Sequence, residues 1–353
     1  MTTHQGVGAG NYFEDFRAGQ ILNHAPARTL TDGDQTLYTA LYGARFATQS
    51  SIEFARSLGF AKAPLDDLLV FHIVFGKTVQ DVSLNAIANL GYADCRFLAP
   101  VFAGDTLSAS TEVLGTRENT NRETGIVYVR STGFNQNGKA ILTFARWVMV
   151  RKRSANVDVP ASIAPSLPKS VPPSALNVFA SKPLTKELRE QTGGSRTFSD
   201  YVVGEKIDHA DGVTVEDAEH MMATRLYHNT ARVHFNAHAE RSGRFGRRIV
   251  YGGHVISVAR AMSFNGFENA FFVAGINAGR HVAPCFAGDT IYAWSKVLEI
   301  TMHPNNHDWG LLRLRTLATK DRACSDYPDK LPDGSFDPAV ILEFDYWVVV
   351  PRA

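Results

Sequence analysis

The chain contains one ordered set of motifs twice. The residue pairs that share an offset of 185 positions are Phe13 and Phe198, Gly19 and Gly204, His24 and His209, and Leu41 and Leu226. Farther along, Pro100-Val-Phe-Ala-Gly-Asp-Thr106 returns as Pro284-Cys-Phe-Ala-Gly-Asp-Thr290, at an offset of 184 positions. A drift of one residue over so long a span is not expected by chance. The sequence therefore predicts two copies of one domain, at residues 1–153 and 196–353.

The segment between the copies, residues 154–195, has the composition of a linker. Its first half carries five prolines among Ser, Ala and Val, namely Pro160, Pro165, Pro168, Pro172 and Pro173. Such a stretch lacks the periodicity of a helix or a strand, which predicts an extended segment that runs over the surface. Residues 184–191 predict a short helix within it.

Each copy begins with helices and continues with strands. The second helix starts near Leu65 in the first copy and near Gly253 in the second, and its apolar residues on most sides predict burial. Four strand-like segments follow in the first copy, at about 91–98, 106–116, 125–135 and 139–151, separated by turn signals. Strands that follow helices through hairpin-length connections predict an α+β domain with an antiparallel sheet. One buried helix wrapped by such a sheet is the hot-dog arrangement, expected here in tandem.

The composition excludes several classes of protein. The chain is 44% hydrophobic and 20% charged, with a formal charge of +1, so neither nucleic acid nor an anionic membrane is indicated as a partner. We see no signal peptide and no apolar stretch of the roughly 20 residues that a membrane span requires. Cys95, Cys285 and Cys324 are too scattered for a disulfide or zinc framework, so we expect a reduced, cytoplasmic location.

The residues best suited to chemistry lie in the second copy. Residues 226–236 contain His228, Asn229, Arg232 and His234, and Gly252-Gly253 precede an apolar run that predicts a helix. A helix N-terminus that begins with glycine offers unpaired backbone N–H groups to an approaching oxygen. Histidine is the side chain that moves protons near neutral pH. The combination predicts a site that polarises a carbonyl group and transfers a proton.

The spacing of these residues resembles the signature of the MaoC-like, R-specific enoyl-CoA hydratases. That signature runs Asp-x-Asn-Pro-x-His and then, fifteen residues after the histidine, Ile-Val-His-Gly before the buried helix. Here His234 occupies the histidine position, and Ile249-Val-Tyr-Gly252 follows fifteen residues on. Residues 284–289 likewise resemble the family's Pro-Val-x-x-Gly-Asp. As a whole, with its linker and duplicated domain, the chain is similar to mesaconyl-CoA hydratases.

The resemblance implies an enoyl-CoA hydratase whose substrate contains coenzyme A and which needs neither a further cofactor nor a metal. His234 would take a proton from water and return one to carbon, and the Gly252 N–H would stabilise charge on the thioester oxygen. Asn229 stands where the family has aspartate. It would hold the nucleophilic water or orient the imidazole, unless it is only a loop asparagine. Tyr251 replaces the family's histidine before glycine, and we expect it to bind substrate together with Gly253.

A substrate such as mesaconyl-CoA carries a second, free carboxylate, which an arginine can bind through its bidentate fork. We expect Arg232 in this role and Arg248 nearby in substrate binding. A solvated basic loop, or contacts with the phosphates of coenzyme A, are the alternatives for both. His234 and His238 have the spacing of zinc ligands, with His228 near, but no cysteine or carboxylate cluster completes such a site.

The first copy departs from the pattern, which predicts that it has no catalytic site. Gln49 replaces His234, Ala44 replaces Asn229, and Asp66-Asp67 stand where Gly252-Gly253 stand. We expect this copy to shape the binding groove and to hold part of the coenzyme A. A hot-dog thioesterase and a non-catalytic thioester-binding protein stay open as alternatives. The two copies are expected to pair with each other inside the chain, and the resemblance implies further association into a homodimer.

Overall fold

The computed structural model describes residues 10–352. Its helices are α1 (Asp32–Tyr42), α2 (Ala47–Ser50), α3 (Ile52–Ser57), α4 (Asp67–Thr78), α5 (Lys186–Arg189), α6 (Asp217–Leu226), α7 (Ala237–Glu240) and α8 (Gly252–Met262). Its strands are β1 (Ile21–Thr29), β2 (Ala86–Phe97), β3 (Thr106–Glu118), β4 (Thr124–Phe134), β5 (Ala140–Arg151), β6 (Lys206–Asp208), β7 (Val213–Thr214), β8 (Phe272–His281), β9 (Thr290–Met302), β10 (Trp309–Lys320) and β11 (Val340–Pro351). A π-helical turn, Val79–Ser83, extends α4.

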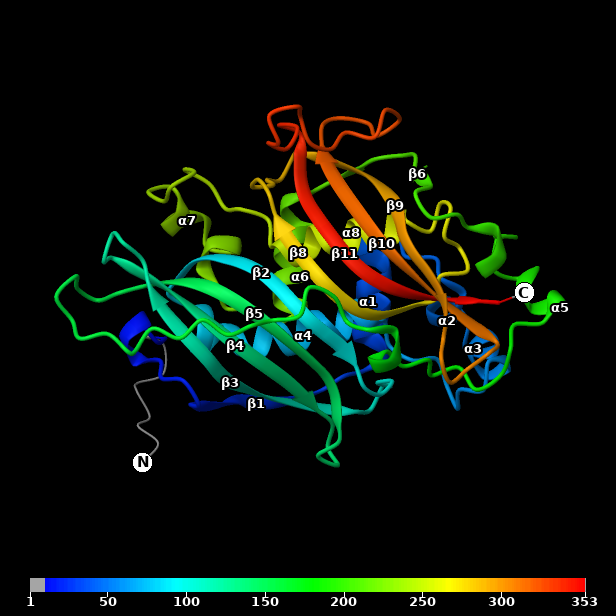
Figure 1. The fold of residues 1–353 in the computed structure, drawn as a ribbon, viewed down its shortest axis with the longest axis horizontal. Helices are drawn as coiled ribbons and strands as arrows, with labels where there is room; N and C mark the ends of the chain where they lie inside the picture. Colours follow the sequence, from blue (N-terminus) through cyan, green and yellow to red (C-terminus); the bar gives the residue numbers. More distant parts are fainter. Residues whose placement is uncertain (1–9, 353) are drawn as a thin grey trace.

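Within residues 10–352, the strands form one continuous antiparallel sheet (Figure 1). Their order is β1-β3-β4-β5-β2-β8-β11-β10-β9-β6, and β7 pairs with β9. The two copies join where β2 and β8 pair, with Cys95 opposite Ile276 and Arg96 opposite Gly275. The copies therefore pair inside the chain, and the predicted α+β architecture of two tandem hot-dog domains is confirmed.

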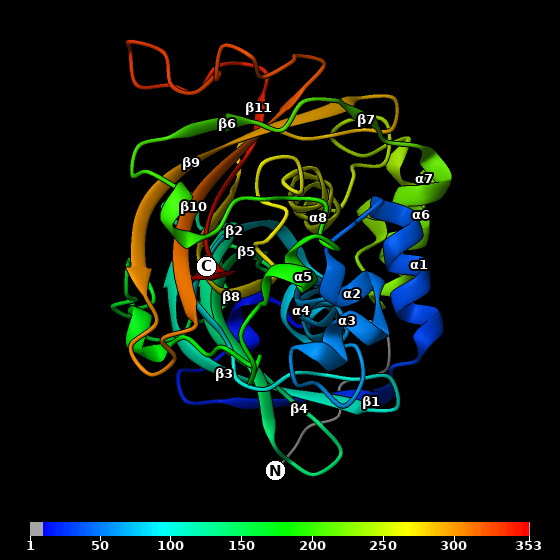
Figure 2. The same cartoon turned by 90° about the vertical axis from the view of Figure 1, so that its right-hand side faces the viewer.

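The helices α4 and α8 lie inside the curve of the sheet, with α1 and α6 on their other side (Figure 2). Residues 68–78 of α4 and 253–262 of α8 are all buried. Apolar side chains surround both helices, and each Å² of apolar surface removed from water contributes about 25 cal/mol to stability. The central position of these two helices explains why neither has the polar face of a surface helix.

The structure adds one strand to those expected in the first copy. Strand β1 lies at an edge of the sheet, and His24 is its only buried residue. Because most of its side chains are exposed and it contains Pro26, it lacks the alternation by which a strand is recognised. The strands β3, β4 and β5 begin and end within two residues of the predicted segments, and β2 begins five residues earlier than predicted.

The histidines that recur in the two copies, His24 and His209, are structural. His24 Nε2 lies 2.7 Å from Thr111 Oγ1 on the neighbouring strand, and its Nδ1 lies 2.6 Å from Asp81. In the second copy, His209 Nε2 lies 2.7 Å from Ser295 Oγ, and its Nδ1 donates to a backbone carbonyl 2.9 Å away. Each ring thus ties the outermost segment of its copy to the adjacent strand.

Two contacts between equivalent residues mark the interface of the copies. The hydroxyl groups of Tyr42 and Tyr227 lie 2.7 Å apart, and His72 Nε2 lies 3.0 Å from Ser257 Oγ. Both pairs are separated by 185 positions, which is the offset of the repeat. The copies are therefore related by an approximate two-fold axis that passes through this polar layer.

The same offset corrects one detail of the sequence comparison. Helix α4 begins at Asp67 where α8 begins at Gly252. Asp67 is thus the counterpart of Gly252, and Asp66 is the counterpart of Tyr251. The assignment of Asp66-Asp67 to Gly252-Gly253 was one residue out, because the loops ahead of the two helices share no residue that fixes their alignment.

Residues 154–195 cross the outer face of the sheet in an extended form (Figure 1). The Val171 N–H donates to Asn277 Oδ1 at 2.8 Å, and the Val171 carbonyl accepts from Trp347 Nε1 at 3.1 Å. Val171, Leu176 and Leu184 are buried. The segment therefore covers apolar residues of β8 and β11 as well as connecting the copies.

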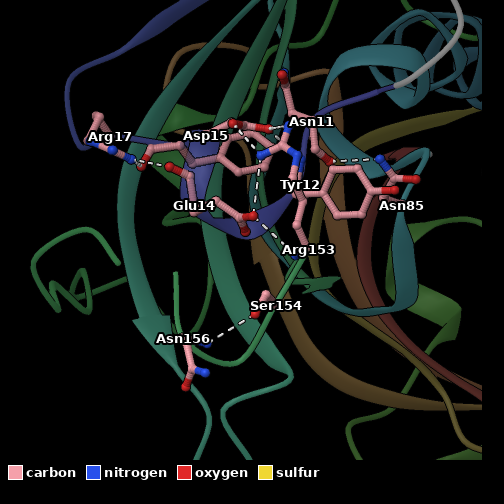
Figure 3. Close-up of polar contacts among 10 residues, drawn as sticks. Asn11, Tyr12, Glu14, Asp15, Arg17, Asn85, Arg153, Ser154 and Asn156 are labelled. Carbon is pink, nitrogen blue, oxygen red and sulfur yellow. Dashed lines mark hydrogen bonds and ion pairs between the residues drawn. The ribbon is translucent and has the colours of Figure 1, made fainter. Parts of the chain in front are cut away.

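Arg153, just after β5, is tied to the first turn of the described chain (Figure 3). Its guanidinium donates to both carboxylate oxygens of Asp15, at 2.8 and 2.6 Å. The Arg153 backbone N–H donates to Glu14 Oε1 at 3.0 Å. These contacts close the first copy by joining its beginning to its end.

Candidate active site

A cavity of about 410 Å³ lies between the two copies, within the size range of sites for small ligands. The first copy contributes Phe75 from α4, Tyr92 from β2 and Arg146 from β5. The second contributes residues of the loop 229–252 and His281 at the end of β8. No Asp or Glu among the described residues lines this cavity. Neither copy alone would form it.

His234 lines the cavity, and one of its two ring nitrogens makes a hydrogen bond within the protein. Its Nδ1 donates to the carbonyl oxygen of Ile249 at 3.0 Å, which fixes the tautomer and leaves the lone pair on Nε2. Burial of the ring lowers the pKa of His234 to about 4. The imidazole is therefore neutral at pH 7 and can accept a proton through Nε2.

Asn229 reaches the cavity through a tight turn after α6. His228 adopts the left-handed conformation, with φ of 52°, and Asn229 Oδ1 then accepts the Ala231 N–H at 3.0 Å. The loop lies against α4 so closely that a Cβ at Gly76 would come within 1.8 Å of the Tyr227 carbonyl oxygen. The side chain is 5% exposed and lines the cavity, and its amide NH₂ has no hydrogen-bond partner among residues 10–352. It can donate but cannot titrate.

Gly252 is the first residue of α8 and also lines the cavity. A Cβ at this position would lie 2.2 Å from Cε1 of His281. The Gly252 N–H has no intrahelical acceptor, and the positive end of the helix dipole lies at the same place. This N–H can therefore donate to an oxygen bound in the cavity.

Tyr251 lines the cavity and Gly253 does not. The Tyr251 ring lies 5.5 Å from the His234 ring and 5.7 Å from the Phe75 ring, and its hydroxyl lies 3.4 Å from His72 Nδ1. A Cβ at Gly253 would meet Tyr251 and His72 within 2.6 Å. The contacts of Gly253 are thus with the polar layer between the copies.

The predicted arginines lie outside the cavity wall. Arg232 is exposed, and Arg248 pairs with Asp217 at 2.5 Å. Neither lines the cavity, whereas Arg244 and Phe245, both exposed, do so where it meets solvent. The structure therefore brings His234, Asn229, Tyr251 and Gly252 together and leaves Arg232, Arg248 and Gly253 apart from them.

The corresponding position in the first copy is filled. The Asp67 carboxylate accepts the Val273 N–H at 2.9 Å, and burial raises the pKa of Asp67 well above its ordinary value. A carboxyl group therefore occupies the start of α4, where α8 has an open N–H. The first copy thus lacks the glycine that begins α8 in the second copy.

Two cavity residues, His281 and Arg146, were not predicted. His281 Nε2 lies 3.4 Å from the Tyr92 hydroxyl, and burial lowers the pKa of His281 to about 4. Arg146 is fully buried. The sequence contained a signal for both. His281 stands where the first copy has Phe97, at an offset of 184, and Arg146 is the one charged residue in the apolar run 140–150.

Among residues 10–352, no three His, Cys, Asp or Glu side chains are grouped so that they could hold a metal ion. The imidazoles of the cavity, those of His234 and His281, make contacts with a carbonyl oxygen and a tyrosine hydroxyl. In the same part of the chain, no helix has the length and apolar character needed to cross a membrane.

The family model of mesaconyl-CoA hydratase matches residues 3–163. The β-methylmalyl-CoA dehydratase of Chloroflexus aurantiacus is 59% identical over 343 residues, which cover 97% of each chain. The mesaconyl-CoA hydratase of Cereibacter sphaeroides is 51% identical over 344 residues, or 98% of this chain and 99% of the relative. Both alignments include the second copy, with the loop that carries His234.

Solved structures also resemble this chain along nearly its whole length. A MaoC domain dehydratase from Chloroflexus aurantiacus superposes with a TM-score of 0.95 at 58% identity, over 98% of both chains. A Mycobacterium tuberculosis protein with a double hot-dog fold matches at a TM-score of 0.73 and 24% identity, over 97% of this chain and 98% of the other, which bears on the fold alone. With its fold, its cavity and relatives of such similarity along its whole length, the chain belongs to the mesaconyl-CoA hydratase family.

Proposed function

We propose that this chain, a hydro-lyase, catalyses the reversible hydration of mesaconyl-CoA to β-methylmalyl-CoA. The observation that carries the proposal is the meeting of His234 and Gly252 in one cavity. His234 offers a free Nε2, and Gly252 offers an unpaired N–H at the start of a helix. The names of the two similar relatives supply the acyl group.

The reaction can be written with these two groups. His234 Nε2 takes a proton from water as the water oxygen bonds to the β-carbon, and the double-bond electrons move to the thioester oxygen as an enolate. The Gly252 N–H stabilises that oxygen, an interaction worth about 3 kcal/mol in comparable sites. The imidazolium then gives its proton to the α-carbon. Because burial lowers the pKa of His234 to about 4, its imidazolium is a strong acid for this second transfer.

Asn229 would place the water. Its Oδ1 is held by the Ala231 N–H, so its amide NH₂ is the part available to the cavity. A donor aimed at the water oxygen leaves the water's own protons for His234. In this scheme Asn229 orients the water and His234 alone transfers protons. The Tyr251 ring packs beside the imidazole.

Coenzyme A would extend from the cavity past Arg244 and Phe245. Both residues line the cavity and are exposed. Arg232 and Arg248, in the same loop, are cationic groups for the phosphates. The basic loop thus supports the binding of the nucleotide end of the substrate, with the acyl end in the cavity.

A spectroscopic assay tests the function directly. Mesaconyl-CoA is mixed with the protein, and the ultraviolet band of the conjugated thioester is followed together with a thiol reagent. Loss of the band without free thiol is the expected result. Loss of the band with release of thiol would instead identify a thioesterase, and no change in either signal would contradict both activities.

The cavity favours hydration over thioester hydrolysis. Hot-dog thioesterases use a catalytic carboxylate, and no Asp or Glu among the described residues lines this cavity. Asp67, at the start of α4, is the first copy's counterpart of Gly252, and its carboxylate accepts the Val273 N–H. The two imidazoles suit proton transfer to and from water and carbon.

A homodimer in the cytoplasm is the proposed biological form. The three cysteines are buried and free, which agrees with a reducing compartment. Light scattering in solution tests the assembly: twice the mass of the 38.7 kDa chain is expected, and a mass of one chain would contradict it.

A further inference from the structure

Arg146 is a buried cation whose hydrogen-bond partners are all neutral. It lies on β5, is 0% exposed and lines the cavity. Its Nη2 donates to Thr78 Oγ1 at 2.7 Å and to Ser83 Oγ at 3.3 Å. Its Nε has no hydrogen-bond partner among residues 10–352, and its Cζ lies 4.2 Å from the centre of the Phe75 ring.

No carboxylate among residues 10–352 pairs with Arg146, in contrast to two other buried cations, Arg260 and Lys152. Arg260, also buried but in the second half, has Asp66 and Asp67 close enough to counter its charge. Lys152 pairs with Glu118 at 2.5 Å. Burial lowers the pKa of Arg146 only to about 10, so the group keeps its charge at neutral pH. A buried charge without a counter-ion is costly, which implies that an anion joins it.

A second side chain in the same cavity also lacks partners. Both Oδ1 and Nδ2 of Asn89 on β2 are buried without a hydrogen bond to any described residue, and Asn89 lines the cavity. The π-helical turn Val79–Ser83 brings Ser83 to this place, next to Arg146. The first copy therefore places three polar groups, Ser83, Asn89 and Arg146, in the wall of the cavity that His234 also lines.

The chemistry of the substrate matches this wall. In a four-carbon enedioate bound as a thioester, the free carboxylate is attached directly to the β-carbon, whichever end carries coenzyme A. Held by a guanidinium, it would fix the carbon that water attacks and would lose much of its repulsion for the entering oxygen. The Phe75 ring lies 4.2 Å from Arg146 Cζ and 5.7 Å from the Tyr251 ring, and Tyr251 in turn packs on His234, so the guanidinium and the imidazole line the same cavity.

We propose that Arg146, assisted by Asn89, binds the free carboxylate of the acyl group and selects dicarboxylic over monocarboxylic thioesters. The inference rests on the proposed function and moves the carboxylate site from the exposed Arg232 to the first copy. The counterpart of Arg146 in the second copy is Tyr346, aligned through Trp147 and Trp347. The second copy thus supplies the base, His234, and the first copy supplies the cation that binds the free carboxylate of the substrate.

The test measures binding of two unreactive ligands, succinyl-CoA and butyryl-CoA, by calorimetry. They have equal chain length, and a methyl group in butyryl-CoA replaces the carboxylate. Wild-type protein should prefer succinyl-CoA. Arg146→Gln should weaken succinyl-CoA binding by about 100-fold or more, the cost of truncating a buried charge pair, and leave butyryl-CoA binding unchanged. Arg146→Lys should keep part of the preference, since it keeps the charge without the planar fork.

Arg260→Gln is the matched control, because it removes a buried guanidinium from the other half. It should lower thermal stability and leave the preference for succinyl-CoA in place. Equal weakening of both ligands by Arg146→Gln would overturn the inference, and so would a selective loss in Arg232→Gln. Should Arg146→Gln fail to fold, Arg146→Lys and Asn89→Ala decide, the latter with an expected selective loss of about tenfold.

These outcomes are distinct from those of the proposed function. Wild-type protein that fails to hydrate mesaconyl-CoA contradicts the function, whatever the ligands show. Wild-type protein that hydrates mesaconyl-CoA while Arg146→Gln retains the preference for succinyl-CoA contradicts the carboxylate site alone.

Discussion

His281 occupies the space that a side chain at Gly252 would need, because a Cβ on Gly252 would lie 2.2 Å from Cε1 of the imidazole. The start of α8 is therefore pressed against a neutral ring of the cavity wall. Glycine is required here for close approach, independently of its freedom of backbone conformation. The contact also sets the position of the N–H that we assign to the thioester oxygen.

Gly252→Ala should reduce kcat for mesaconyl-CoA by about 100-fold, because the methyl group must push aside His281 or the helix end, and the donor to the oxyanion moves with it. Steady-state kinetics and a thermal unfolding curve measure the two effects separately. The double variant Gly252→Ala with His281→Ala should recover stability, since the clash is removed. Wild-type turnover in Gly252→Ala would show that the donor position does not matter.

His234→Gln should lower kcat by a factor of about 10³, within the range found for loss of a general acid–base group. Glutamine can still donate to the Ile249 carbonyl, so the fold and the unfolding temperature should be nearly unchanged. His238→Gln, in the same loop but exposed, is the control and should keep full activity. Retention of turnover by the His234 variant would remove it from the mechanism.

The pH profile of kcat/KM should have its acid limb near pH 4, well below the 6.5 of an ordinary histidine. The pKa of His234 is lowered to about 4 by burial, so the free base persists across the physiological range. Activity should be flat from about pH 5.5 upward on this account. An enoyl-CoA without a second carboxylate should be used in parallel, because the substrate's own acid titrates nearby. An acid limb at pH 6.5 with both substrates would contradict the assignment.

Stability should decrease as the pH falls below about 6.5. Burial lowers the pKa of His72 and His254 to about 3 and of His209, His234 and His281 to about 4. Between these values and 6.5 the unfolded chain binds protons that the folded chain does not, at about 1.4 kcal/mol per histidine and pH unit. Asp66 and Asp67, with raised pKa values, act in the opposite direction but are fewer. Urea unfolding at pH 7.5 and 5.5 should show the loss, and equal stability would exclude it.

Asn229→Asp should keep the turn, because a carboxylate oxygen can still accept the Ala231 N–H. The new anion in the cavity should raise the pKa of His234 and move the acid limb of kcat/KM to higher pH. Loss of the amide donor should lower kcat, and Asn229→Ala should lower it further. An unchanged pH profile would mean that Asn229 does not face the imidazole.

The repeat within the sequence determined most of the fold prediction. Motif pairs such as His24 and His209 predicted two equivalent domains, and apolar segments predicted the buried helices and the strands β3 to β5. The sequence does not predict strand β1, because an edge strand with mostly exposed side chains lacks the alternation of apolar and polar residues. Patterning records which residues a chain buries, and β1 buries only His24.

The site was predictable only where its residues are close in sequence. His234, Asn229 and Gly252 lie within 24 residues, and the structure places all three on one cavity. Arg146 and His281 come from strands outside that loop, and the pairing of β2 with β8 joins the copy that carries Arg146 to the copy that carries the loop. The sequence favours Arg232 as the carboxylate-binding residue because it lies inside the motif. Nearness in sequence does not determine whether a side chain points into the cavity, and Arg232 does not line it.

The β2–β8 junction makes assembly of the cavity a folding step and not an association. A site shared by two separate subunits is lost when the subunits dissociate on dilution. This site persists at any protein concentration at which the chain is folded. Identical subunits would also repeat every substitution at both of their sites. Covalent fusion lifts that restriction, so one copy can begin its buried helix with Asp67 while the other begins it with Gly252.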